Sequence, residues 1–212
     1  EYVTAYIPNP HLNPSELRVS FAQEIGVKLA GLKKYELLNA INLRLIELAK
    51  QDKKVVLMVD EAQAMPEETI EALRLLTNLE TETAKLFQVV LFGQPELDEL
   101  LRRNSLRQLL QRITFSYRLK PLDHEAVQHY IEQRVQRAGF EGVSLFKRDA
   151  ANKIAQASRG IPRLVNILSH KSLMAAYGKG DIQVNARHVY SAVEDTEGVS
   201  LQGKSAWQLP IL

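Results

Sequence analysis

The sequence contains no cysteine, which excludes disulfide bonds, thiolate metal sites and cysteine nucleophiles, and is compatible with a reducing compartment. It also has no long hydrophobic run, because the longest apolar stretches, such as 55–59 and 89–92, are strand-sized and far too short to span a membrane. Neither sign of charge is in large excess, since the net charge is only +2, so composition alone does not argue for nucleic acid or anionic lipid as a partner. What remains is an ordinary globular composition, with 45% hydrophobic and 25% charged residues among 212, enough for one large domain or two small ones.

Up to about Lys120, strand-like and helix-like segments alternate along the chain. Strands are expected at 2–7, 55–59, 87–92 and 113–119, and helices at 15–25, 34–51, 106–111 and after Pro66 and Pro95. The continuous apolar run 55–59 is typical of a parallel strand that is covered on both faces. This alternation predicts an α/β fold with a parallel sheet, whose ligands bind at the carboxyl ends of the strands.

Beyond Pro121 the patterns are helical only. Helices are expected at 123–139, 148–158, 162–178 and 185–194, with Asp123 and Asn185 as candidate caps and Pro162 in a first turn. The sequence therefore predicts a partial α/β core at 1–120, a small all-α domain at 121–195 and a tail at 196–212.

Two carboxylates, Asp60 and Glu61, directly follow the apolar strand 55–59. In magnesium-dependent nucleotide hydrolysis, the first carboxylate of such a pair holds the metal ion, and the second orients the water that attacks the terminal phosphate. An acidic pair that simply opens a solvated loop is an equally good interpretation of this motif alone.

Other polar residues stand where they would complete such a site. Gln94 follows the next strand, so it is expected at the same edge of the sheet, although a glutamine in a turn before a proline is the simpler interpretation. Arg112, or nearby Arg107, is placed to reach from one subunit toward a neighbour's nucleotide. Arg163 lies in the first turn of a predicted helix, where it is suited to touch a phosphate. Each arginine taken singly is better explained as a surface residue, and only the order of the whole set favours function.

Four segments together resemble the AAA+ superfamily: 55–63 (VVLMVDEAQ), 91–97 (LFGQPEL), 111–113 (QRI) and 160–165 (GIPRLV). They are similar to its Walker B, sensor 1, arginine-finger and sensor 2 regions. The sequence motifs DEAQ and GQPEL resemble those of the ExeA (general secretion pathway protein A) branch. The overall layout of the chain is similar to that of MshM-type proteins of MSHA pilus biogenesis. The resemblance implies ATP and Mg²⁺ as cofactors, with Asp60 holding the metal ion, Gln94 and Arg163 contacting nucleotide, and Glu61 and Arg112 acting in catalysis. It also implies a helical lid domain and homo-oligomers with nucleotide at the subunit interfaces.

The chain departs from this family in one respect, because it contains no G-x-x-x-x-G-K-[ST] loop. In the family this loop precedes the strand that matches 2–7, and its amides and lysine cradle the phosphates. We therefore expect that Glu1 is not the natural start, and that these 212 residues alone bind ATP weakly or not at all.

Three functions remain in competition at the level of sequence. The first is an ATPase that couples nucleotide state to assembly of a type IV pilus or type II secretion machine, cytoplasmic or peripheral at the inner membrane, with inner-membrane assembly proteins as partners. The second is a DNA-targeting ATPase similar to the TniB transposition proteins, which near-neutral charge disfavours. The third is a non-hydrolysing scaffold in which the missing loop is natural.

Overall fold

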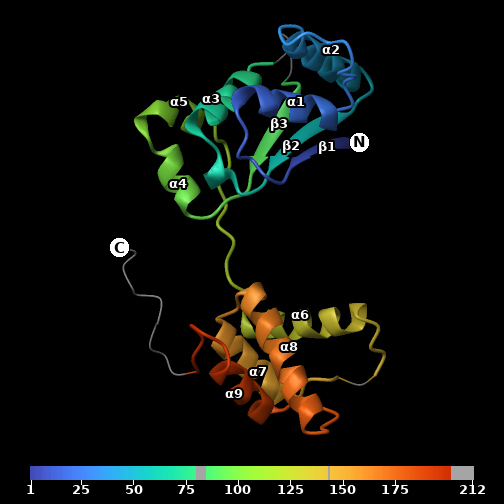
Figure 1. Cartoon of the computed structure of the whole chain (residues 1–212), viewed down its shortest axis with the longest axis vertical. Coiled ribbons are helices and arrows are strands. Elements are labelled where there is room, and N and C mark those ends of the chain that lie inside the picture. Colours follow the sequence, from blue (N-terminus) through green and yellow to red (C-terminus); the bar gives the residue numbers. More distant parts are fainter. Residues whose placement is uncertain (80–84, 143, 202–212) are drawn as a thin grey trace. The chain divides into compact units, whose positions relative to one another are not determined.

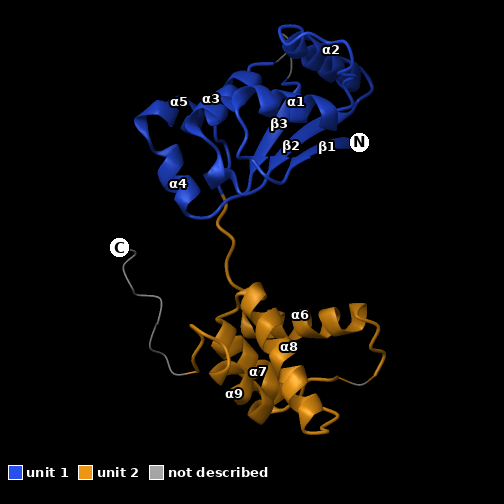
Figure 2. Ribbon diagram, in the orientation of Figure 1, with its two compact units in different colours: residues 1–116 blue, residues 117–212 orange. Residues whose placement is uncertain are grey.

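The computed structural model describes residues 1–79, 85–142 and 144–201. It separates into two compact units, 1–116 and 117–212, which Figure 2 colours blue and orange. The division between Ser116 and Tyr117 lies just before the domain boundary predicted near Lys120. Most of the predicted tail lies outside the described residues.

Unit 1 is built on a parallel sheet with the strand order β1-β2-β3. The strands are β1 (Tyr2–Ile7), β2 (Lys54–Val59) and β3 (Phe87–Leu91). Ile7 stands opposite Val59, which stands opposite Leu91, so the three strands end level with one another. The residues that follow β2 and β3 are therefore brought to one edge of the sheet, as the sequence predicts.

In the described part of unit 1, five α-helices accompany this sheet: α1 (Pro14–Glu24), α2 (Leu37–Lys50), α3 (Glu67–Leu76), α4 (Glu96–Leu101) and α5 (Arg107–Leu110). The α1 helix begins at a capping box, in which Asn13 accepts from the backbone of Glu16 and the Glu16 side chain accepts from the backbone of Asn13. It packs against β1, α2 and α3 (Figure 1), and its Phe21 ring lies 5.0 Å from the ring of Phe87 on β3. This packing places the core of unit 1 between the sheet and α1.

Burial of β2 is complete on one face only. Val55, Leu57 and Val59 are fully buried, whereas Val56 and Met58 are half-buried. The prediction of a strand covered on both faces is therefore only half met within the described part of unit 1.

The prediction of a strand at 113–119 is wrong. These residues form no strand, and Phe115, Tyr117 and Leu119 are 93%, 83% and 82% exposed. Alternating β-branched and aromatic residues favour extended backbone, but a strand also requires a neighbour whose N–H and C=O groups it can pair with. No described strand lies beside this segment, so the local preference has no ladder to join.

Unit 2 is helical: α6 (His124–Arg137), α7 (Arg148–Ser158), α8 (Pro162–Gly178) and α9 (Ala186–Glu194). The predicted starts of these helices are confirmed, because Asp123 and Asn185 accept backbone N–H groups of their first turns and Pro162 opens α8. The four helices surround a separate core that includes Val127, Ile154 and Leu168. Among the residues described in either unit, no helix combines the length and apolar character that crossing a membrane requires.

Candidate functional site

Asp60 lies at the carboxyl end of β2, where its backbone N–H donates to the carbonyl of Ile7 at 3.0 Å. Its Oδ2 accepts a hydrogen bond from the hydroxyl of Tyr6 on β1, at 3.1 Å. This hydrogen bond to a carboxylate, with desolvation and the charge of Asp60 adding to it, raises the pKa of the Tyr6 hydroxyl above its ordinary value. The two edge residues are thus coupled, and the acidic side chain is held toward β1.

Glu61 has the left-handed backbone conformation, with φ 49° and ψ 38°. This conformation costs a residue with a side chain about 1–2 kcal/mol, and such strain concentrates at functional sites. The Glu61 N–H turns back to donate to Asp60 Oδ1 at 2.9 Å, and the chain then enters a 3₁₀ turn over Ala62–Ala64. The side chain of Glu61 remains exposed.

Two amide side chains converge on the Glu61 carboxylate. The Nε2 group of Gln63 donates to Glu61 Oε2 at 2.5 Å, and the Nε2 group of Gln94 donates to the same oxygen at 3.3 Å. Gln94 follows β3, so the structure brings together the residues that the sequence placed at a common sheet edge. All of these groups lie within unit 1.

Sequence reasoning missed two members of this cluster, Tyr6 and Gln63. The register offered a signal for Tyr6, because a parallel strand that ends level with β2 carries its penultimate residues to the same edge. Gln63 could not be recognised in the same way, because its reach to Glu61 depends on the left-handed turn at Glu61, which no propensity predicts for a glutamate.

The donor set suits a hard divalent cation only as part of a larger site. Asp60 offers two carboxylate oxygens, each of which accepts one hydrogen bond and retains a free lone pair. Within the described ranges, no cluster of three or more acidic or histidine residues could hold a metal ion by itself. Mg²⁺ commonly takes one or two carboxylates and completes its shell with water and phosphate oxygens, so Asp60 fits as one such ligand.

Neither of the two arginines that the sequence singles out in unit 1 is hydrogen-bonded to these carboxylates. Arg112 is exposed, and its Nη1 donates to the Oγ1 of Thr77 at 3.1 Å, just beyond the end of α3. Arg107 is the exposed first residue of α5. The structure therefore does not bring either arginine into the carboxylate cluster of its own chain.

Arg163 belongs to unit 2, where it is exposed in the first turn of α8. The preceding Gly160 has φ +73°, and a Cβ there would lie 1.9 Å from the carbonyl oxygen of Leu122. The start of α8 is thereby fixed against the segment that leads into α6. The role predicted for Arg163 stays a prediction.

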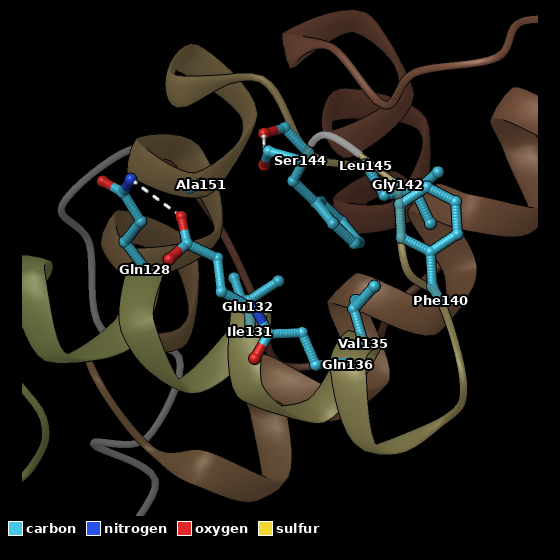
Figure 3. A pocket seen from close by; sticks show the side chains of 11 residues that line it. Gln128, Ile131, Glu132, Val135, Gln136, Phe140, Gly142, Ser144, Leu145 and Ala151 are labelled. Atoms are coloured by element: carbon cyan, nitrogen blue, oxygen red, sulfur yellow. Dashed lines mark hydrogen bonds between the residues drawn. The ribbon is translucent and has the colours of Figure 1, made fainter.

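A cavity of about 250 Å³ also lies in unit 2, beside α6 (Figure 3). Ile131, Val135 and Phe140 line it with apolar surface, and Gln128 donates to Glu132 at 3.1 Å on its polar side. None of the site residues predicted from sequence lines this cavity.

Comparisons with known proteins agree with this architecture. A family model described as AAA domain matches residues 1–101. General secretion pathway protein A of Aeromonas hydrophila is 40% identical over 207 residues, which are 96% of this chain and 37% of that protein. The chain thus spans little more than a third of this relative.

Solved structures share the fold. Cdc6p from Pyrobaculum aerophilum matches with a TM-score of 0.66 and 19% identity, over 94% of this chain and 54% of that one. The Aeropyrum pernix ORC2 protein, solved as ADPNP and ADP complexes, matches with a TM-score of 0.63 and 15% identity, over 95% of this chain and 54% of that one. The match to the AAA domain model, the similarity to general secretion pathway protein A, and the parallel sheet with a helical second unit together support an AAA+ ATPase of the general secretion pathway protein A branch.

Proposed function

We propose that the protein containing this chain binds and hydrolyses ATP at the edge of the sheet formed by β2 and β3. The observation that carries the proposal is the convergence of Asp60, Glu61 and Gln94 at the carboxyl ends of neighbouring parallel strands. Parallel α/β sheets bind ligands at this edge. The similarity of residues 1–101 to the AAA domain model supports nucleotide as that ligand.

Each residue of this cluster has a distinct task. Asp60 would hold Mg²⁺, which supplies charge neutralisation at the phosphates when bound. Glu61 accepts a proton from, and orients, the attacking water, since its carboxylate is exposed and fixed by neutral donors. Gln94 offers an uncharged donor close to the terminal phosphate without adding negative charge there.

Catalysis further involves arginines supplied from other places. Arg112 acts on the nucleotide of a neighbouring subunit, because it is exposed and its own hydrogen bond is to Thr77 rather than to the carboxylates. Arg163 contacts phosphate from the start of α8, where the N-terminal end of a helix also favours an anion. The nucleotide then lies between subunits of a homo-oligomer, and its state changes their association.

The work driven by ATP is assembly of an envelope machine, either a type II secretion system or an MSHA-like pilus. This step rests on the name of the relative from Aeromonas hydrophila and on the resemblance of the motif layout to MshM-type proteins. The protein would act at the cytoplasmic side of the inner membrane, with membrane assembly proteins as partners.

Glu61→Gln in the full-length protein is the decisive experiment. The substitution keeps the size of the side chain but removes its charge, so ATP turnover falls at least about 100-fold while ATP binding stays within a few-fold of wild type. Glu68→Gln is the matched control, because Glu68 is an exposed glutamate in the first turn of α3 and should leave turnover unchanged. Undiminished turnover in Glu61→Gln contradicts the proposal.

Calorimetric titration of ATP into the 212-residue chain tests the contribution of the phosphate-binding loop. Because these residues contain no G-x-x-x-x-G-K-[ST] sequence, ATP should bind at best weakly, with a Kd of about 1 mM or above. Micromolar binding would show that the carboxylate edge and its surroundings hold nucleotide without that loop.

A further inference from the structure

The amide of Gln63 is engaged at both ends. Its Nε2 donates to the carboxylate of Glu61 at 2.5 Å, and its Oε1 accepts the backbone N–H of Gln94 at 3.1 Å. These two partners determine the orientation of the amide, since a carboxylate accepts only and an N–H donates only. A single half-buried side chain thus connects the loop after β2 with the loop after β3.

Backbone contacts bring these two loops close enough for one side chain to bridge them. The N–H of Ala62 donates to the carbonyl of Phe92 at 2.8 Å. Gly93 then passes so close that a Cβ there would lie 3.0 Å from Gln63 Oε1 and 2.8 Å from Leu97 Cδ2. The absence of a side chain at Gly93 is therefore what leaves room for the Gln63 amide.

The same oxygen of Glu61 also accepts from the side chain of Gln94, at 3.3 Å. Gln94 thus makes two hydrogen bonds to this group of residues: its backbone N–H donates to Gln63, and its side chain donates to Glu61. Hydrogen bonds to a charged acceptor are stronger than those between neutral groups, so the three residues fix one another's orientation. A carboxylate on a strained, exposed turn would otherwise sample several rotamers.

We propose that Gln63 is the positioning residue of this site, which sets the Glu61 carboxylate and the Gly93–Gln94 loop in one fixed arrangement. The inference rests on the hydrolytic role proposed for Glu61. Gln63 does not touch the reacting atoms; it acts through Glu61 and Gln94. Any displacement of the Gly93–Gln94 loop by a ligand is transmitted to the Glu61 carboxylate through this amide.

The first experiment measures the bridge directly in the 212-residue chain and needs no ATP turnover. Gln63→Met keeps the length of the side chain but removes both hydrogen bonds, so the Gln94 backbone N–H should exchange with solvent about tenfold faster, as followed by NMR. Gln51→Met, at an exposed glutamine of the same unit, should leave that exchange rate unchanged. Equal exchange of the Gln94 N–H in wild type and Gln63→Met overturns the proposal, provided that both spectra show the folded protein.

Gln63→Glu gives a second variant of the same shape. It retains an acceptor for the Gln94 N–H but replaces the amide that donates to Glu61 with a carboxylate. The exchange rate at Gln94 should therefore stay near that of wild type, in contrast to Gln63→Met. If both variants release Gln94 equally, the bridge does not work through the Gln63 Oε1 atom and the proposal fails.

The third experiment uses turnover of the full-length protein. Gln63→Met should lower kcat about 10- to 100-fold with KM for ATP within about twofold, because the misplaced Glu61 affects the transition state more than binding. In the Glu61→Gln background, Gln63→Met should cause no further loss.

The exchange and turnover experiments together distinguish the hydrolytic role proposed for Glu61 from the positioning role proposed for Gln63. Turnover that survives Glu61→Gln removes the hydrolytic role of Glu61, while the exchange measurement still decides whether Gln63 connects the loops. A wild-type kcat in Gln63→Met, in a protein that Glu61→Gln inactivates, overturns Gln63 as a positioning residue.

Discussion

The two units differ in how they hold the polar residues predicted to act on nucleotide. Unit 1 places its carboxylates on turns beyond the strand ends, where Glu61 has a left-handed backbone and Tyr6 and Gln63 hold the acidic groups. In unit 2, α6 and α9 begin at side-chain caps and α8 begins at a proline, and the predicted functional residue Arg163 is an exposed side chain in the first turn of α8. The carboxylates of unit 1 are thus oriented by neighbouring side chains, whereas the phosphate contact predicted for Arg163 depends only on where α8 begins.

The largest test of this comparison is whether the two units unfold separately. Leu57→Ala, at a fully buried residue in the middle of β2, should destabilise unit 1 by about 3–4 kcal/mol through lost burial and a cavity. Leu168→Ala on α8 should do the same to unit 2. Calorimetry with residue-resolved exchange would show two transitions that respond one at a time, since each leucine belongs to its own core. A joint shift of both transitions would show that the units are one cooperative body.

A second test concerns the backbone that sets the start of α8. Gly160→Ala should destabilise unit 2 by about 3 kcal/mol, because φ is +73° and the new Cβ would lie 1.9 Å from the carbonyl oxygen of Leu122. Gly139→Ala is the matched control, since φ is +92° but no atom lies within 4 Å of its Cβ position. Its cost should be only the backbone term of about 1 kcal/mol. Equal denaturation midpoints for the two variants would refute the close approach at Gly160.

Helix caps offer a third test, in which the units should behave alike. Asn13→Ala in unit 1 and Asp123→Ala in unit 2 each remove a side chain that accepts a backbone N–H of a first turn. Each substitution should cost about 1 kcal/mol, measured on the transition of its own unit by urea denaturation. A markedly larger loss at Asn13 would indicate that the loop between β1 and α1 also supports the carboxylate edge.

The smallest expected effect is a loss of folding stability at alkaline pH, and it is confined to unit 1. Folding raises the pKa of Tyr6 through its hydrogen bond to Asp60, so the unfolded chain ionises first as pH rises. The contribution of this bond to stability is thus complete below the ordinary tyrosine pKa of about 10 and is lost as pH passes the raised value. NMR titration should show the Tyr6 pKa falling in Asp60→Asn, where the neighbouring negative charge is gone. An unchanged Tyr6 titration would contradict the coupling.

The sequence predicted most elements because local signals and tertiary context agree there. Asp123 and Asn185 cap helices where the sequence placed them, and the apolar run 55–59 is a central parallel strand. The prediction of a strand at 113–119 failed because a strand needs a neighbouring strand to pair with, whereas the residue types indicate only an extended backbone. The edge position of Asp60, Glu61 and Gln94 followed from strand order alone, whereas the contacts of Tyr6 and Gln63 depend on side-chain geometry and a left-handed turn.

The left-handed turn at Glu61 also bears on any attempt to stabilise the protein. Glycine adopts φ 49° without the steric penalty that a glutamate incurs, so Glu61→Gly is the substitution that a search for greater thermal resistance would favour at this position. The same change would delete the carboxylate on which Gln63 and Gln94 converge. Position 61 is therefore one where resistance to heat and chemical competence oppose each other, and directed evolution for one should erode the other.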